Sequence, residues 1–182
     1  MKKRMWAIIM MVLFFGMTGN VIAASDTYDH ELTVEDITFA WSIAGDSLNV
    51  RLQAKTDAWV GIGFNPTSRM KDANIIIGFV KDGEVTVVDH FGTAERGHEM
   101  DTRVGGKSNV DNISGKEAGG TTEISFSVPL NSDDPKDRPI WTNKPNTILL
   151  AHGAGRDSFR TKHVRRMVLE VNLQTGEFKK VK

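Results

Sequence analysis

The chain has 182 residues, of which 23 are basic and 23 acidic, and it contains no cysteine. The lack of cysteine excludes disulfides, thiolate metal sites, a lipid-modified cysteine and covalent haem attachment through C-x-x-C-H. The balanced charge gives no sign of nucleic-acid binding, for which a strongly basic surface is typical.

The first 24 residues have the layout of a secretory signal peptide. A basic start, Lys2 to Arg4, precedes an apolar stretch from Met5 to about Met17, and small residues follow at Ala23 and Ala24. We expect cleavage near these alanines and export to the periplasm or the medium. An uncleaved membrane anchor is the alternative. Since the segment holds three basic residues, the remainder carries 20 basic against 23 acidic residues.

The mature chain, residues 25–182, is expected to form one domain that is large enough to bury a core. None of its segments approaches about 18 uninterrupted apolar residues, so we do not expect it to span a membrane. Most of its apolar residues alternate at period two, which indicates half-buried strands. In chain order, the predicted strands are 39–43, 48–54, 59–64, 73–80, 85–88, 123–128, 148–151, 167–173 and 178–181.

Turns and loops separate these strands. Asp82-Gly83 is a strong hairpin signal, whereas residues 92–120, rich in glycine and charge, and the proline-bearing residues 131–146 are predicted to be loops. About ten short strands in a domain of this size predict an all-β fold, an antiparallel β-sandwich.

Met70 is the methionine best placed to bind a ligand. Of the three methionines in the mature chain, Met167 keeps phase with a predicted strand, and Met100 lies in a polar loop. Met70 lies in a short loop between two buried strands, where a rigid scaffold presents functional groups. A packing role for its side chain is the alternative.

Two of the five histidines, His152 and His163, flank a glycine-bearing loop after an apolar strand. Either could face a ligand. Basic residues crowd the same region and would suit an anionic partner; they are Arg156, Arg160, Lys162, Arg165 and Arg166. A methionine and a histidine brought together by the fold would form the axial pair of a low-spin haem, whose propionates the basic residues could bind. Without cysteine, such a haem would be non-covalent haem b.

Several sequence blocks, in this order, resemble a DOMON domain: WVGIGFNP, a following methionine, DANIIIGFV, KDGEVTVVDHF, TEISFSVPL, ILLAHGAG and KHVRRMVLEVNL. The similarity extends from about Leu32 to Leu173, and we assign residues 25–182 to the domain. The resemblance implies an immunoglobulin-like sandwich, exported from the cell, that binds haem b or, in other branches of the family, a sugar.

In the haem-binding branch, a methionine after the W-x-x-x-G-F strand and a histidine before the final strand hold the iron. By position these are Met70 and His163, with His152 as the alternative ligand. We expect Trp59 and Phe64 of the W-x-x-x-G-F strand to line the cofactor site, and Arg165 and Arg166 to bind the propionates.

The first hypothesis is therefore an exported electron-transfer module rather than an enzyme. Its partner would be a separate redox protein or a membrane electron carrier. The second hypothesis is a sugar-binding or other ligand-binding sandwich without haem, with Trp41, Trp59 or Trp141 as a stacking platform. The third is a copper or zinc protein that uses the imidazoles of His90, His98 and His152.

Overall fold

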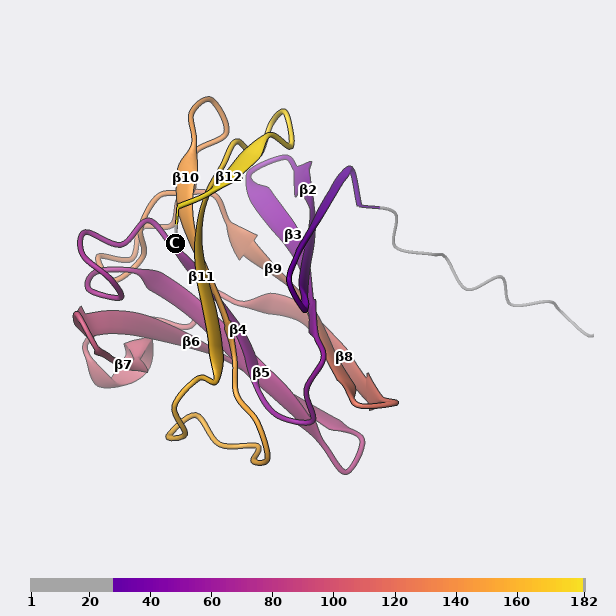
Figure 1. Ribbon diagram of the computed structural model, residues 1–182. Helices are drawn as coiled ribbons and strands as arrows, with labels where there is room; N and C mark the ends of the chain where they lie inside the picture. The colour runs from indigo at the N-terminus through magenta and orange to yellow at the C-terminus, as the bar shows by residue number, and fades with distance from the viewer. Residues whose placement is uncertain (1–27, 182) are drawn as a thin grey trace, which may run out of the picture.

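The computed structural model describes residues 28–181 and shows two antiparallel sheets that pack face to face (Figure 1). The predicted signal peptide, residues 1–24, lies outside the described residues. Within residues 28–181 the only helical element is the 3-10 turn η1, Asp101–Arg103. No helix in this part of the chain has the length and hydrophobicity needed to cross a membrane.

The smaller sheet has five strands, and its three central strands follow from period-two alternation. Its order is β1 (His30–Val34), β2 (Ile37–Ala44), β3 (Ser47–Ala54), β9 (Thr121–Pro129) and β8 (Asp111–Ala118). Leu48, Val50 and Leu52 of β3 are fully buried, whereas the residues between them are half-buried. One face of this sheet therefore forms half of the core.

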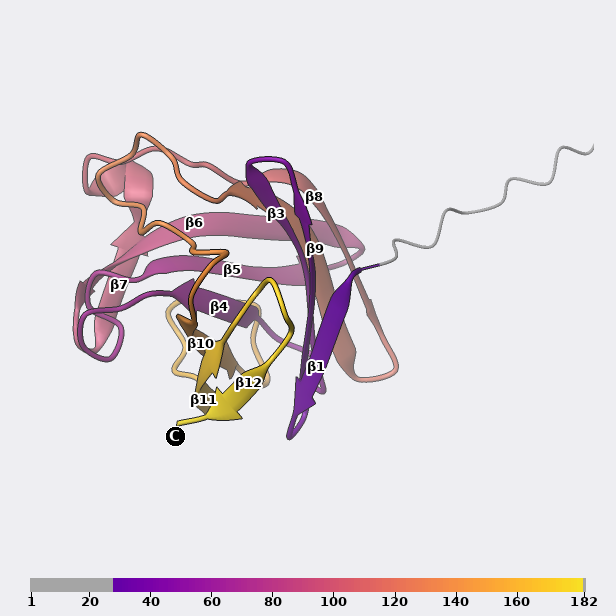
Figure 2. The same ribbon diagram turned by 90° about the horizontal axis from the view of Figure 1, so that it is seen from above.

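The larger sheet has seven strands. Its order is β12 (Phe178–Lys180), β11 (Arg165–Val171), β10 (Asn146–His152), β4 (Val60–Phe64), β5 (Asn74–Lys81), β6 (Glu84–Ala94) and β7 (Gly97–Met100). Figure 2 shows that β4, β5 and β6 run across the strands of the smaller sheet, as in orthogonally packed sandwiches.

The prediction of an all-β antiparallel sandwich is confirmed. The residues described form twelve strands, however, where about ten were expected. Residues 92–120, predicted to be loops, contain the end of β6 together with β7, η1 and β8. The prediction failed there because all residues of β8 except Gly115 are exposed, so its sequence lacks the apolar alternation that marks a half-buried strand.

The core lies between the sheets and is anchored by Trp41 of β2. This side chain is fully buried, its ring stacks on Phe39 at 4.6 Å between centroids, and its indole N–H donates to the Leu173 carbonyl at 2.9 Å. A buried tryptophan removes about 150–250 Å² from water, which stabilises the fold by roughly 4–6 kcal/mol.

The second face of the larger sheet is also apolar, and we call it the outward face. Alternation directs Ile62, Phe64 and Ile76 toward the core, and their strand neighbours toward the outward face. The outward-facing residues of β4, β5, β6 and β10 are mostly apolar and include Gly61, Gly63, Ile75, Ile77, Phe79, Val88, His90, Leu149 and Ala151, with Thr86 and Thr147 on the same face. Ile75 and Ile77 are buried although they lie outside the main core cluster. Loops must therefore cover this face.

Candidate functional site

Residues 65–73, here called the Met70 loop, join β4 to β5 and pack against β6. Met70 is half-buried, and its backbone is held by two hydrogen bonds. Its N–H donates to the Glu95 carbonyl at 3.4 Å, and its carbonyl accepts from Ala73 N–H at 3.1 Å. The Met70 carbonyl lies directly over Gly92, where any Cβ would come within 1.6 Å of the oxygen. Since Gly92 is two residues beyond the outward-facing His90, the loop lies on the outward face.

The Met70 loop is also anchored at its first residue. Asn65, with a positive φ of 52°, is buried, and its side-chain amide donates to the Pro139 carbonyl at 2.7 Å and to Asn146 Oδ1 at 2.8 Å. The Asn65 side-chain oxygen accepts from Thr147 N–H at 3.0 Å. These bonds explain why the chain turns sharply at this asparagine and presents Met70 in a defined place.

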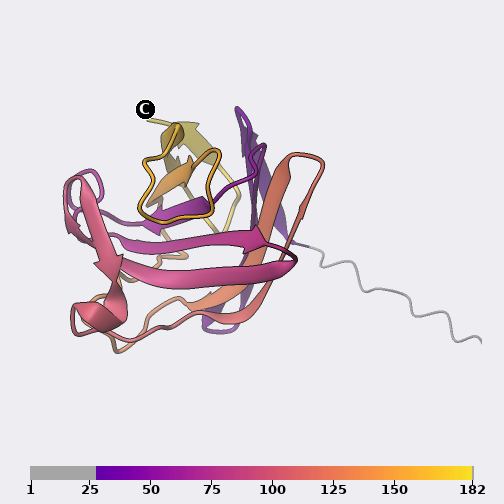
Figure 3. The same cartoon turned by 90° about the horizontal axis from the view of Figure 1, so that it is seen from below.

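Residues 153–164, here called the His163 loop, cover another part of the outward face (Figure 3). The Phe159 ring packs on Phe79 of β5 at 4.9 Å and on His90 of β6 at 5.9 Å between centroids. At the start of β4, the indole N–H of Trp59 donates to Thr161 Oγ1 at 2.9 Å. The two loops that carry Met70 and His163 therefore lie on the same face of the larger sheet.

Three imidazoles, those of His90, His98 and His163, lie near one another at the His163 loop. His90 Nδ1 lies 2.7 Å from His98 Nδ1, and His90 is buried with its Nε2 lacking a hydrogen-bond partner. Burial, reinforced by His98, lowers the pKa of His90 to about 4. Burial lowers the pKa of His98 too, with a further contribution from His163 nearby. Imidazoles with such pKa values are neutral at pH 7 and can bind metals through nitrogen.

The pKa of His163 is lowered as well, which favours the neutral imidazole. Burial is the main cause that lowers its pKa, and the positive charge of Arg166 acts in the same direction. His163 thus shares the outward face with the His90 and His98 pair, which the sequence pattern did not connect to it. The signal available in the sequence was only the alternation of β6 and β7, which puts His90, His98 and Met100 on one face.

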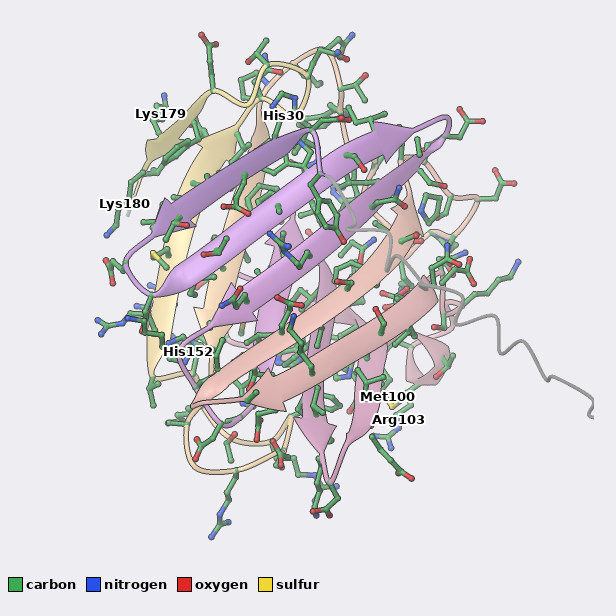
Figure 4. The ribbon with its side chains drawn as sticks, turned by 90° about the vertical axis from the view of Figure 1, so that its right-hand side faces the viewer. His30, Met100, Arg103, His152, Lys179 and Lys180 are labelled. Carbon is green, nitrogen blue, oxygen red and sulfur yellow. The ribbon has the colours of Figure 1, made fainter. Side chains whose placement is uncertain are left out.

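His152 lies on the opposite side of the larger sheet. It is buried, its Nδ1 lies 2.7 Å from the Gly153 carbonyl, and its Nε2 lies 3.1 Å from Asp36 Oδ2. Figure 4 shows it far from Met100, the β7 partner of His90. The predicted copper or zinc set is therefore not assembled as proposed: His90 and His98 meet, but His152 is separate and both of its nitrogens have partners.

The other predicted cofactor-site residues divide between the two faces. Trp59 is on the outward side, but Phe64 is fully buried in the core between the sheets. Arg165 lies 3.5 Å from Glu35 and 3.7 Å from Asp36, so its guanidinium already has anionic partners. Within residues 28–181, Arg166 forms no salt bridge.

The tryptophans predicted as a sugar platform are largely covered. Trp41 is fully buried in the core, which removes it as a stacking surface, and Trp59 is only 5% exposed. The half-buried Trp141 ring has the Lys144 ammonium over it at 3.6 Å from the centroid, a cation–π contact. Only Trp141 has a ring that a sugar could approach, after displacement of that lysine.

Sequence reasoning missed a cluster of three carboxylates at the far end of β6. Asp89, Asp101 and Asp137 each offer an oxygen, and these oxygens lie within 4.8 Å of one another. Burial raises the pKa of Asp89 to about 8 and that of Asp101 to about 7, with repulsion from Asp137 adding to both. The three residues are separated by 12 and 36 positions in the sequence, so no local motif marks them.

Comparisons with curated proteins relate part of this chain to longer proteins. Human DBH-like monooxygenase protein 1 is 27% identical over 147 residues, which cover 78% of this chain and 23% of the relative. The mouse protein of the same name is 31% identical over 112 residues, which cover 62% of this chain and 18% of the relative. The chain therefore spans less than a quarter of their length, and the activity in their name belongs to those whole proteins.

Two solved structures share the fold. The cytochrome b domain of pyranose dehydrogenase from Coprinopsis cinerea has a TM-score of 0.56 at 10% identity, over 77% of this chain and 80% of that domain. The cytochrome domain of Myriococcum thermophilum cellobiose dehydrogenase has a TM-score of 0.52 at 12% identity, over 68% and 64% of the two chains. At such identities the likeness is one of fold.

The family model described as "DOMON domain" matches residues 33–153. This range includes the last two residues of β1, all of β2 to β10 and the Met70 loop, and the remaining strands β11 and β12 complete the same larger sheet. Since the match covers well over half of the 182 residues, the chain belongs to the DOMON domain family.

Proposed function

We propose that this domain binds one haem b on the outward face, with Met70 and His163 as axial ligands, and that it transfers electrons. The observation that carries the proposal is that the Met70 loop and the His163 loop both cover the outward face, with apolar strands beneath them. A thioether and a neutral imidazole are the axial pair of low-spin cytochromes. Haem held in this way would supply reversible one-electron transfer at iron.

The residues of the outward face fit a flat apolar group. Gly61 and Gly63 bring no side chains to the centre of the sheet, and Ile75, Ile77 and Leu149 surround them with aliphatic surface. The unpartnered Nε2 of buried His90 adds a polar atom that a bound group or a water could satisfy. The ring of Phe159 packs against Phe79 and His90 and occupies part of this face. The His163 loop, which carries Phe159, would therefore have to move away from the sheet to make room for haem.

The basic residues have different roles in this proposal. Arg166 lies beside His163 and is the better candidate for a propionate, because Arg165 already pairs with Glu35 and Asp36. We propose that the electron partner is a separate redox protein or a membrane electron carrier. The exposed Val164, 62% accessible and next to His163, would then lie at the surface where that partner approaches.

The test is a visible spectrum of the purified protein after expression with a haem precursor. We expect a sharp Soret band and distinct α and β bands on reduction, with one haem per chain. Met70→Leu and His163→Ala should each convert the low-spin spectrum to a high-spin one or lose haem. A protein that stays colourless after haem reconstitution would refute the proposal.

Matched variants separate ligation from folding. Met100→Leu changes a half-buried methionine of β7, and His30→Ala changes a half-buried histidine of β1; both should keep the low-spin spectrum. Circular dichroism and thermal unfolding of the apoproteins should show that the two ligand variants remain folded. Loss of the spectrum in Met100→Leu but not in Met70→Leu would assign the thioether ligand to Met100 instead.

A second candidate is a transition-metal site at His90, His98 and His163. It is favoured by the 2.7 Å separation of the His90 and His98 Nδ1 atoms and by the proximity of His163 to His98. Neutral imidazoles are ligands of copper and zinc. Metal analysis of the purified protein distinguishes the candidates, since copper or zinc that is lost in His98→Ala, without haem, would favour this alternative.

A further inference from the structure

The three carboxylates at the end of β6 meet in a part of the molecule that the haem proposal does not use. Asp89 faces inward from β6, opposite Ile76 of β5, while Asp101 begins η1 after β7 and Asp137 lies in residues 131–145. We propose that Asp89, Asp101 and Asp137 bind a hard divalent cation, and that this cation is Ca²⁺. This inference does not rest on haem binding.

The oxygens of this cluster lack the partners that buried carboxylates require. Asp101 is fully buried, and neither of its oxygens has a hydrogen-bond partner. Asp89 is 4% exposed; its Oδ2 accepts from Asn109 N–H at 2.9 Å, but its Oδ1 has no partner. Asp137 accepts from Ser132 Oγ at 2.5 Å through Oδ2, and its Oδ1 also has no partner. Each of the three residues thus has a buried oxygen without a hydrogen-bond partner.

Asn109, which contacts Asp89 through its backbone, also has an unpartnered oxygen. The side-chain Oδ1 of Asn109 is buried without a hydrogen-bond partner, and the backbone N–H of the same residue donates to Asp89. Buried polar atoms without partners are rare in folded proteins and indicate a water or an ion that satisfies them. An amide oxygen is an ordinary ligand of Ca²⁺, and it is not an additional charge.

No cationic side chain forms a salt bridge with the cluster within residues 28–181. Lys136 places its ammonium over the Phe91 ring at 5.1 Å from the centroid, and its charge lowers the pKa of Asp101, but less than burial and the neighbouring aspartates raise it. Carboxylates that are removed from water are destabilising in their charged form unless they are paired or coordinate a metal, and otherwise they take up protons. A divalent cation would remove this cost for all three at once.

The separations of the carboxylate oxygens are compatible with Ca²⁺. Ca²⁺ takes six to eight oxygens at about 2.3–2.6 Å, so two ligands on opposite sides of the ion lie about 4.8 Å apart. The carboxylate oxygens of the cluster lie within this separation of one another. Mg²⁺ requires a near-ideal octahedron at about 2.0–2.1 Å, and it retains several waters. A cluster of carboxylates on three different segments suits the more flexible coordination of Ca²⁺.

The ion would join segments that are distant in the chain. It would connect the β6–β7 hairpin, η1 and residues 131–145, which otherwise meet mainly through hydrogen bonds such as that of Asp134 Oδ2 with Lys107 N–H. We therefore expect Ca²⁺ to raise the melting temperature of the protein. With free Ca²⁺ at about 100 times its Kd, the expected rise is about 5–10 °C for a domain of this size.

The experiment is thermal unfolding of the purified protein, dialysed against EGTA and then supplied with CaCl₂ or MgCl₂. Mass spectrometry of metals after gel filtration should give one Ca²⁺ per chain. Asp101→Asn should lose the Ca²⁺-dependent rise, yet it should be at least as stable as the wild type in EGTA, because it replaces a buried carboxyl group, which has no hydrogen-bond partner, with a neutral amide of similar size. Asp133→Asn alters an exposed aspartate of the same loop and should keep the full rise.

Three outcomes would overturn the proposal. A melting temperature that does not respond to millimolar Ca²⁺, together with the absence of bound Ca²⁺, would show that the cluster is not a cation site. The same rise in Asp101→Asn would place any bound ion elsewhere. An equal rise with MgCl₂ at the same concentration would contradict the assignment to Ca²⁺.

Discussion

Replacing Gly92 with alanine is expected to detach the Met70 loop from β6. The new Cβ would lie 1.6 Å from the Met70 carbonyl oxygen and 2.7 Å from its carbonyl carbon, and both atoms belong to the backbone. Side-chain rotation cannot relieve such a clash, so the loop must move. Overpacking typically costs about 1–3 kcal/mol.

The moving loop would also lose hydrogen bonds to β6. Asp72 N–H donates to the Gly92 carbonyl at 2.7 Å, and Gly92 N–H donates to the Ala73 carbonyl at 2.9 Å. At about 1 kcal/mol for each bond, the total loss is about 3–5 kcal/mol. This is a large part of the 5–15 kcal/mol that stabilises a typical domain, and it corresponds to a fall in melting temperature of about 6–20 °C.

The assay is thermal unfolding with Gly97→Ala as the matched control. Gly97 lies on the same hairpin, and a Cβ there meets no atom closer than 3.8 Å, which is ordinary contact. We expect the control to change the free energy of unfolding by less than about 0.5 kcal/mol. If Gly92→Ala is as stable as Gly97→Ala, the backbone of the Met70 loop does not lie where the structure has it, and the placement of Met70 fails with it.

Three further variants or conditions test other parts of the structure. Trp59→Phe removes the indole N–H that donates to Thr161; it should cost about 1–2 kcal/mol and accelerate hydrogen exchange in the loop it anchors, and unchanged exchange would argue against that anchor. His152→Ala should lower the stability by about 2–5 kcal/mol, because it empties a buried site and breaks two hydrogen bonds, but it should leave the visible spectrum of haem-loaded protein unchanged. In EGTA, stability should fall as the pH rises from about 7 to 8, since Asp89 and Asp101 have folded-state pKa values of about 8 and 7, above the usual value of about 3.9 for the unfolded chain, and the folded state therefore binds more protons. The lowered pKa values of His90, His98 and His163 act in the opposite direction, but only below about pH 6.5, where the unfolded histidines become protonated. Melting temperatures at pH 7 and 8 measure the effect of the aspartates, and a higher value at pH 8 would contradict the buried acidic cluster.

The strands of the core could be predicted from the sequence because burial alternates along them. The hairpin predicted at 39–43 and 48–54 is β2 and β3, and the strand predicted at 73–80 is β5, displaced by one residue. β6 extends to Ala94, well beyond the predicted end at residue 88. Its second half contains the buried polar residues Asp89 and His90, which interrupt the apolar pattern. The apolar alternation thus failed to predict the end of β6, where Asp89 belongs to the carboxylate cluster and His90 to the histidine cluster.

The two edge strands β7 and β8 were missed for a related reason. β7 is only four residues long and half-buried throughout, and β8 has almost no buried surface, so neither carries a period-two signal. Their positions depend on pairing with β6 and β9, which is a long-range property. Local sequence patterns contain little information about such pairing.

The candidate site was only partly predictable. The sequence identified the Met70 loop and the His163 loop, because each follows an apolar strand. It could not indicate that His98 lies near His163, 65 positions later, since the topology of the larger sheet decides that proximity. One error could have been avoided from the sequence. Trp59 and Phe64 are five residues apart and therefore point to opposite faces of the strand, so they could not both line one cofactor.

The four edge strands of the two sheets affect how this protein can associate with other proteins. β12 has three exposed residues, including Lys179 and Lys180; β8 is polar and exposed, and β1 and β7 are short. Charged, short edges resist the addition of a foreign strand and so protect a β-protein from aggregation. Association through sheet extension is therefore disfavoured at both ends of each sheet. A protein that exchanges electrons with this domain would have to dock on its loops and faces.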